Sequence, residues 1–284
     1  MRLFLQLAAL GGILCVVGAV ILTEGSTSLP KSSRLWQIDP SAEEATVTAT
    51  DGAILRGACF RPSGPIRGAV IVLHGVGDHG HSMTGLARLL TRQGYIVLVP
   101  DSRAHGGSGG DRITYGLLER TDVVSWLNWI DVRFHPPAYY GYGASLGGGI
   151  LIQSLEIEPR FRAIIAECPF ADFHTVAYDR LSEMAPKILT APFIETAFLY
   201  TRLRYGLNLY AASPENVLRR SHTPTLLIHG TDDRNIPIEH SRRLHASNPA
   251  TTELWEIEHA THVNAWARAG TAFETRVIDW FEKH

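Results

Sequence analysis

The segment Gly143-Ala144-Ser145-Leu146-Gly147 has the residue spacing of a nucleophile elbow, in which a serine stands on a tight turn between a strand and a helix. An apolar run precedes the segment and a helical pattern follows it, as such a turn requires. Glycines suit the flanking positions because side chains there would collide with neighbouring backbone. Free amide groups at the helix N-terminus would stabilise negative charge beside the hydroxyl. We therefore expect Ser145 to be a nucleophile.

A serine hydroxyl attacks well only when a neighbouring base removes its proton. Two pairs of candidates lie downstream of Ser145, each in a loop after an apolar run: Asp232 with Asp233, and His259 with His262. Both loops should open at the same sheet edge as the serine, so an acid and a base can reach it. Position favours Asp233 as the acid, and His262, expected to open the last helix, as the base. Asp232 and His259 remain alternatives.

A tetrahedral intermediate formed at Ser145 would need two N–H donors aimed at its negative oxygen, and loss of one such donor costs about 2.7–4 kcal/mol in comparable sites. The N–H of Leu146, directly after the serine, is one predicted donor. The other should come from the loop His74-Gly75-Val76-Gly77, whose glycines permit a close backbone approach. We assign it to the N–H of Val76.

These residues can meet only if a sheet carries their loops to one edge. After residue 41 the chain alternates short apolar runs with helical patterns, which indicates an α/β fold with a mostly parallel sheet and helices on both faces. The first two runs flank Asp51-Gly52, a good hairpin turn, so the sheet should open with an antiparallel pair. The expected strands are 45–50, 53–60, 69–73, 95–99, 138–142, 163–167, 225–229 and 252–257. The expected helices are 83–92, 117–130, 146–155, 238–246 and 265–281.

One interval, between residues 167 and 222, is too long for a simple crossover between strands. It is rich in Leu, Ala, Tyr and Phe and is interrupted by Pro186 and Pro192. We interpret residues 170–220, approximately, as a helical cap inserted over the carboxyl edge of the sheet; a long ordinary helix with a loop is the alternative. Its apolar residues that would suit either a substrate pocket or a core include Phe193, Phe198 and Tyr200.

The N-terminal segment differs in character from the rest of the chain. Residues 3–22 carry no charge, and a helix of this length at ~1.5 Å per residue reaches about 30 Å, the thickness of a bilayer core. We predict that residues 1–22 form a transmembrane signal anchor, with a cleaved signal peptide as the alternative. A polar linker, 23–41, and a catalytic domain, 42–284, follow. The catalytic domain is expected outside the cytoplasm. It would be anchored to the membrane if the N-terminus is retained, and secreted or periplasmic if the N-terminus is cleaved.

Charge argues against a nucleic-acid partner and residue spacing argues against a metal, and acyl transfer on a serine needs no cofactor. The formal net charge is -2 without a long run of one sign, whereas phosphate binding relies on clustered Lys and Arg. The cysteines lack metal-ligand spacing and are expected to be free: Cys15, Cys59 and Cys168. A group of loop residues without a recognised ligand spacing is interpreted as backbone partners: His74, Asp78, His79, His81 and His105.

Taken together, these motifs resemble the α/β-hydrolase superfamily over nearly everything after residue 41. The hairpin around Asp51-Gly52 and the following Arg61-Pro62 are similar to the opening of its esterase and serine aminopeptidase-like branches. The segment 74–79 resembles the oxyanion loop of monoacylglycerol lipases, and 101–108 matches a D-x-R-x-H-G-x-S turn that is structural in those families.

The same resemblance bears on the acid and the base. Residues 229–237 are similar to the segment whose aspartate is the triad acid, which favours Asp233 over Asp232. The family's Gly-His at the base corresponds to Thr261-His262, so the glycine is replaced here. The cap resembles none that would identify a substrate.

We therefore expect a serine hydrolase, carboxylesterase- or lipase-like, that cleaves an ester or related acyl bond through an acyl-enzyme on Ser145, His262 and Asp233. A peptidase of the serine aminopeptidase type is the enzymatic alternative. A membrane-anchored binding protein without catalysis is a further alternative, although the presence of every triad member argues against it.

Overall fold

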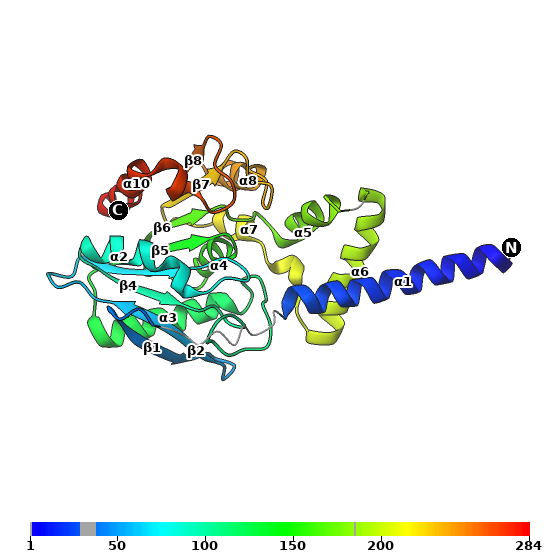
Figure 1. Cartoon of the computed structure of the whole chain (residues 1–284), viewed down its shortest axis with the longest axis horizontal. Coiled ribbons are helices and arrows are strands. Elements are labelled where there is room, and N and C mark those ends of the chain that lie inside the picture. The colour runs from blue at the N-terminus through cyan, green and yellow to red at the C-terminus, as the bar shows by residue number, and fades with distance from the viewer. Residues whose placement is uncertain (1, 29–37, 185) are drawn as a thin grey trace.

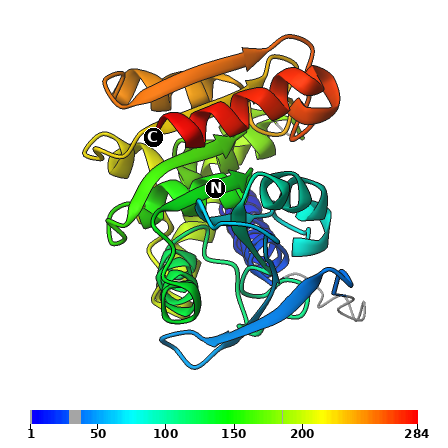
Figure 2. The ribbon, with the colours of Figure 1, turned by 90° about the vertical axis from the view of Figure 1, so that its left-hand side faces the viewer.

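Within the residues that the computed structural model describes, 2–28, 38–184 and 186–284, the strands form one sheet in the order β1-β2-β4-β3-β5-β6-β7-β8. β2 pairs antiparallel with both β1 and β4, and all other neighbours are parallel. Figure 2 shows β8 (orange) and the β1–β2 pair (blue) at opposite edges. The strands are β1 Ala42–Thr48, β2 Ile54–Phe60, β3 Gly68–Leu73, β4 Tyr95–Pro100, β5 Tyr139–Ala144, β6 Phe161–Glu167, β7 Thr225–Gly230 and β8 Thr252–Ile257. The predicted α/β-hydrolase fold with its antiparallel opening is confirmed.

Helices cover both faces of the sheet, which explains the continuous apolar runs of its central strands. Successive side chains of a strand point to opposite faces. Val70 and Val72 of β3 belong to the apolar cluster that includes the helices α2 and α10, whereas Ile71 and Leu73 belong to the cluster on the other face, which includes α3, α4 and α8. These helices are α2 Thr84–Arg92, α3 Glu119–Phe134, α4 Leu146–Ser154, α8 Glu239–Ser247 and α10 Thr271–Lys283.

The interval predicted as a cap contains α7 Pro214–Leu218, which packs against α4 and α8 beside the sheet. The elements that project from the end of the sheet (Figure 1) are α5 Phe173–Ser182, α6 Lys187–Tyr205 and the short 3-10 turn η2 Leu209–Ala211. Pro186 stands at the N-cap of α6, and Pro192 lies inside that helix, within its first two turns. Phe173, Phe198 and Leu209 pack together in a small apolar cluster that joins these elements.

The last helix was predicted as one element, and the structure corrects this. Gly270 has φ 55° and ψ −128°, a conformation outside any helix, and it separates α9 Ala265–Ala269 from α10. His262 does not open a helix either: it lies in a turn three residues before α9. His259 likewise lies in a turn beyond the end of β8.

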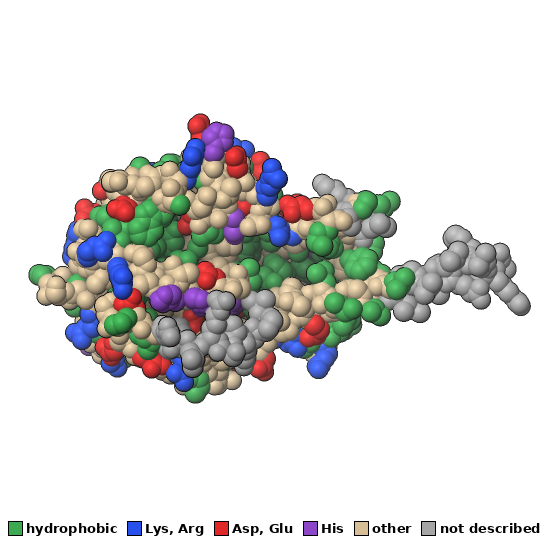
Figure 3. All heavy atoms as spheres, viewed as in Figure 1, with side chains coloured by type: hydrophobic (Ala, Val, Ile, Leu, Met, Phe, Trp, Pro, Cys, Tyr) green, Lys and Arg blue, Asp and Glu red, His purple; other side chains and the backbone are tan. Residues whose placement is uncertain are grey.

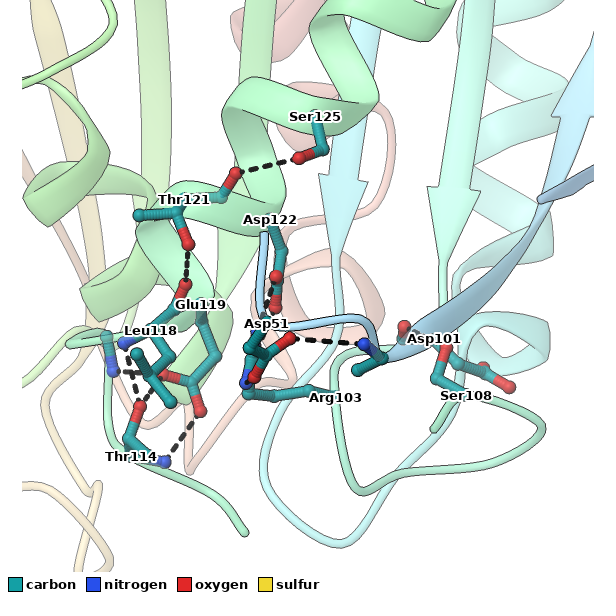
Figure 4. Close-up of polar contacts among 12 residues, drawn as sticks. Asp51, Asp101, Arg103, Ser108, Thr114, Leu118, Glu119, Thr121, Asp122 and Ser125 are labelled. Carbon is teal, nitrogen blue, oxygen red and sulfur yellow. Dashed lines mark hydrogen bonds and ion pairs between the residues drawn. The ribbon is translucent and has the colours of Figure 1, made fainter. Parts of the chain in front are cut away.

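A buried arginine joins the segment 101–108 to the rest of the domain (Figure 4). Arg103 donates through Nε and Nη2 to both carboxylate oxygens of Asp122 on α3, at 2.7 Å each, and through Nη1 to Asp51 in the β1–β2 turn at 2.7 Å. Asp101, also buried, accepts the backbone N–H of Gly107 at 2.6 Å. A bidentate arginine–carboxylate contact fixes the relative orientation of the two side chains. The segment 101–108 therefore acts as a structural clamp that holds its own loop to α3 and to the β1–β2 turn.

The N-terminal helix α1, Arg2–Thr27, extends past the predicted end of the apolar segment at residue 22, and it lies beside α6 (Figure 1). Among the residues that the structure describes, no helix is both long enough and apolar enough to cross a membrane. Residues 29–37 of the predicted linker lie outside the described residues, as does Met1 of the predicted anchor. Cys15, Cys59 and Cys168 are free thiols, as expected.

Candidate active site

Ser145 stands on the turn between β5 and α4 with φ 53° and ψ −116°, a backbone conformation that L-residues rarely adopt. The turn is crowded on both sides. A Cβ at Gly143 would lie 2.4 Å from the carbonyl oxygen of Gly147, and a Cβ at Gly147 would lie 2.4 Å from that of Leu73. The two glycines of the motif are therefore required for close packing around the serine, as the spacing indicated.

The side chains of Ser145, His262 and Asp233 form one chain of hydrogen bonds. His262 Nε2 lies 2.9 Å from Ser145 Oγ, and His262 Nδ1 lies 2.7 Å from Asp233 Oδ2. Because a carboxylate can only accept, Nδ1 carries the imidazole proton, and the lone pair of Nε2 faces the hydroxyl. In this tautomer the imidazole can take the proton of the serine as it attacks.

The carboxylate of Asp233 is buried and surrounded by donors. Its Oδ1 accepts the backbone N–H groups of Asn235 at 2.8 Å and Ile236 at 3.0 Å, and Oδ2 lies 3.3 Å from His229 Nε2. Burial raises the pKa of Asp233, but hydrogen bonds from His229 and His262 and from the Ile236 backbone outweigh it and hold that pKa well below its usual range. Asp233 is therefore ionised whenever the protein is folded near neutral pH.

The alternative residues, Asp232 and His259, pair with each other instead. His259 Nδ1 lies 3.2 Å from Asp232 Oδ2, and these side chains are 71% and 53% exposed. The structure thus brings Asp233 and His262 to the serine and leaves the neighbouring pair in solvent.

The two predicted oxyanion donors belong to segments that border Ser145. Leu146 is the first residue of α4, so its N–H has no acceptor within the helix. Val76 follows Gly75 in a turn closed by a 3.3 Å hydrogen bond from the Asp78 N–H to the Gly75 carbonyl. A Cβ at Gly75 would lie 3.4 Å from the Cβ of Ser145, so this loop packs directly against the nucleophile.

Ser145 and His262 open into a cavity of about 640 Å³ between the sheet edge and the cap, and Val76 and Leu146 also line it. Figure 3 shows apolar side chains (green) gathered in the hollow between the domain and the cap. Apolar cap residues that line the cavity include Phe170, Phe173, Val176, Ile194, Phe198 and Leu209. An apolar acyl group fits the chemistry of this lining.

A family profile identifies the protein family of this chain. The profile of the family described as serine aminopeptidase, S33, matches residues 64–205, half of the chain. The chain belongs to this α/β-hydrolase family. It is 29% identical over 258 residues to YfhR of Escherichia coli K12, covering 87% of this chain and 83% of YfhR. It is 24% identical over 246 residues to rat monoglyceride lipase, covering 75% of this chain and 81% of the lipase.

Solved structures share the fold of this family member. The esterase Pf2001 of Pyrococcus furiosus superposes with a TM-score of 0.73 at 21% identity, covering 90% of this chain and 98% of the esterase. The monoacylglycerol lipase of Paleococcus ferrophilus superposes with a TM-score of 0.59 at 23% identity, covering 80% and 97%. At these identities the likeness is one of fold.

Glu167, a buried carboxylate at the end of β6, was not predicted from the sequence. Its Oε1 accepts the Ala265 N–H at 3.1 Å, its other oxygen accepts the Tyr142 hydroxyl, and its carbonyl accepts the Ser145 N–H at 2.7 Å. Glu167 therefore joins the nucleophile turn to the segment that carries His262. A carboxylate closing an otherwise apolar run was the available signal.

Three residues beside the site, Cys168, His229 and Asp233, place potential ligand atoms within 4.8 Å of one another. Both ring nitrogens of His229 are already engaged: Nε2 donates to the Ile236 carbonyl at 2.8 Å, and Nδ1 accepts from Ser241 at 2.7 Å. Burial raises the pKa of the Cys168 thiol well above its usual value, which keeps it neutral. These contacts leave no free donor set for a metal.

Two histidines of the group singled out in the sequence, His74 after β3 and His105 after β4, also have backbone partners, whereas Nε2 of His105 has no hydrogen-bond partner among the described residues. His74 Nδ1 donates to the Gly75 carbonyl at 2.7 Å, and Nε2 accepts the Ser102 N–H at 3.0 Å. His105 Nδ1 contacts the Arg103 carbonyl at 2.8 Å. These histidines act as backbone partners of the loops, which is how the sequence was interpreted.

Proposed function

We propose that this S33 family member is a serine hydrolase that cleaves carboxylic esters through an acyl-enzyme on Ser145. The observation that carries the proposal is the hydrogen-bonded chain Ser145–His262–Asp233 at the mouth of an apolar cavity. A hydroxyl, an imidazole in the accepting tautomer and an ionised carboxylate at these distances are the groups that acyl transfer needs.

In the first step His262 Nε2 takes the proton of Ser145 as the oxygen attacks the ester carbonyl, and the developing oxyanion is held by the N–H groups of Val76 and Leu146. The protonated imidazole, stabilised by Asp233, then gives its proton to the leaving alcohol, and the acyl-enzyme remains. Water, activated by the same imidazole, attacks the acyl-enzyme and releases the acid. These reaction steps need no cofactor.

An apolar ester is favoured over a peptide by the lining of the cavity. An aminopeptidase would need a carboxylate for the substrate amine, and Asp78 is a carboxylate that lines the cavity. Its two oxygens already accept the His79 N–H at 2.8 Å and the Ser82 hydroxyl at 2.6 Å. The names of relatives also favour esters: monoglyceride lipase in rat and lysophosphatidylserine lipase in zebrafish.

The family description keeps a serine aminopeptidase activity as the second candidate. Turnover of p-nitrophenyl esters against aminoacyl p-nitroanilides separates the two, and we expect esters to be cleaved faster. The reverse order would reject the ester proposal and favour the peptidase.

The decisive variant is Ser145→Ala, which should lower ester turnover by a factor approaching ~10⁶, as loss of the nucleophile does in other triads. His262→Ala should do the same, whereas His259→Ala, its exposed neighbour, should retain wild-type turnover. A fluorophosphonate probe should label the wild type and not Ser145→Ala. Absence of labelling in the wild type would favour a binding protein without catalysis, and unchanged turnover in Ser145→Ala would overturn the assignment.

We also propose that the N-terminal segment anchors the chain to a membrane with the catalytic domain on the extracytoplasmic side. Support comes from the uncharged stretch 3–22 and from described apolar side chains exposed on α1 and α6, including Leu14, Val17, Ile21, Leu199 and Leu203. A cleaved, secreted or periplasmic form is the alternative. Fractionation of C-terminally tagged protein tests both, because recovery of the full-length chain in the cytosol contradicts either one.

A further inference from the structure

The carboxyl-terminal turns of α1 form part of the cavity that contains the nucleophile. Leu22, Thr23 and Ser26 line the same cavity as Ser145 and His262, although they are more than a hundred residues away in sequence. From the sequence, Leu22 was expected at the end of an anchor, and Thr23 and Ser26 in a linker. In the fold they belong to a helix that lies beside α6 of the cap, and three sets of contacts hold them there.

A polar cluster fixes the side of α1 that faces α6. The carboxylate of Glu24 accepts the hydroxyls of Tyr200, at 2.9 Å, and of Tyr205, and it pairs with Arg112 at 3.1 Å. The guanidinium of Arg112 also lies over the ring of Tyr205, 3.5 Å from its centroid. Three side chains from two other segments thus converge on Glu24 of α1.

The carboxyl end of α1 is hydrogen-bonded to the segment that leads into α3. The Ile113 N–H donates to the Thr27 carbonyl at 2.7 Å, and the Tyr115 hydroxyl donates to the Ser26 carbonyl at 2.9 Å. These bonds satisfy terminal carbonyls that a helix leaves without partners. Tyr115 itself lines the cavity and stacks on Phe173 of the cap, with ring centroids 3.6 Å apart. The end of α1 is therefore continuous with the cavity wall.

Close backbone packing joins α1 to α6 further up the helix. A Cβ at Gly18 would lie 2.4 Å from Cε1 of Phe193, so only a glycine fits without displacement of that ring. A Cβ at Gly12 or Gly25 of the same helix would lie more than 4 Å from the described atoms of other elements. The fit at Gly18 is specific to the face that α6 covers.

We propose that α1 is a permanent wall of the acyl pocket, and that Leu22, Thr23 and Ser26 help to select the length of the acyl chain. This inference rests on the proposed ester hydrolysis and names the part of the chain that selects its substrate. It also implies that α1 stays on the working enzyme, because cleavage after residue 22 would remove the segment that Gly18 fixes on α6 and loosen the wall.

The test uses the full chain and a series of p-nitrophenyl esters from acetate to dodecanoate. Leu22→Trp narrows the cavity and should lower kcat/KM for the dodecanoate ester about tenfold relative to the acetate ester. A substrate that is one or two methylene groups too long for an apolar pocket is discriminated by about that factor. Leu22→Ala should shift the preference toward longer chains. Ile21→Trp and Ile21→Ala are matched controls, because Ile21 is the adjacent residue, is 67% exposed and does not line the cavity; they should keep the wild-type profile.

A second pair of variants tests the docking of α1 without changing the lining. Gly18→Leu should displace the helix from α6 and flatten the chain-length profile while acetate turnover, which depends on the triad, is retained. Gly12→Leu, the same change in open space, should leave the profile as it is. Acetate turnover reports that each variant is folded, and the Leu22 pair decides the matter if Gly18→Leu does not fold.

The outcomes separate this inference from the proposed function. If acetate is hydrolysed through Ser145 but the Leu22 variants keep the wild-type profile, α1 is not a wall of the pocket and only this inference falls. A working enzyme whose mature chain begins after Thr27 would also overturn it. If Ser145→Ala hydrolyses esters as well as the wild type does, the proposed function falls and this inference falls with it.

Discussion

Asp233 and Asp232 offer a test in which two adjacent residues of one type should behave in opposite ways. In Asp233→Asn the side chain keeps one oxygen and gains an NH₂ group. The fixed backbone N–H groups of Asn235 and Ile236 demand the oxygen, so the NH₂ must face His262. The imidazole can then avoid a clash only by moving its proton to Nε2, which turns the base into a donor toward Ser145.

The expected magnitude follows from that tautomer change. The same substitution in a serine-protease triad lowers kcat by about 10⁴, which corresponds to about 5.5 kcal/mol of transition-state stabilisation. Asp232→Asn removes only a pair whose side chains are 53% and 71% exposed, and such pairs contribute roughly 0–1 kcal/mol to stability. Its turnover should stay within about twofold of wild type.

The assay is kcat/KM for a p-nitrophenyl ester, with circular dichroism melts to show that both variants fold. The reasoning is refuted if Asp233→Asn keeps more than about a tenth of wild-type turnover, or if Asp232→Asn loses as much as Asp233→Asn does.

Three further predictions concern stability and are checked by urea unfolding. Gly147→Ala would bring a Cβ within 2.4 Å of the β3 backbone and should cost about 1–3 kcal/mol, whereas Gly64→Ala, which meets nothing within 4 Å, should not. Asp122→Ala removes the carboxylate that accepts two hydrogen bonds from the buried Arg103 and leaves this guanidinium only the partly exposed Asp51, so it should cost about 1.5–3 kcal/mol; a loss below about 1 kcal/mol would contradict the clamp. Burial, with the nearby His105 adding to it, lowers the pKa of His74 from 6.5 to about 4, so between these values the unfolded chain binds the proton that the folded chain refuses. The free energy of unfolding should therefore fall by roughly 3 kcal/mol as the pH drops from 6.5 to about 4. The His74→Gln variant should lack this part of the decrease in stability.

Much of the fold could be predicted because its central strands are buried on both faces. A strand such as 69–73 reads as an uninterrupted apolar run, and the loops after parallel strands open at one edge. That geometry is what allowed Ser145, an acid and a base to be placed together from the sequence. The family match covers residues 64–205 of this domain, which include Ser145.

The parts that could not be predicted depend on directions and partners that a sequence does not encode locally. Asp232 and Asp233 are chemically identical neighbours, and only the turn after β7 decides which one points inward. Gly270 was a visible sign of a helix break, but a single glycine inside a helical pattern is often tolerated. For α1, apolarity predicts burial without saying whether lipid or protein provides the cover, so its contacts with α6 could not be foreseen.

The contact between Glu24 and Tyr200 joins residues 176 positions apart in the chain. A ribosome that adds about 5–20 residues per second delivers α6 roughly 10–35 s after α1 has emerged. During that interval the nascent first helix has no cap to rest on, and its apolar side must be sheltered by a chaperone or a bilayer. Biogenesis of this enzyme is thus tied to whatever holds the first helix until the last third of the chain is made.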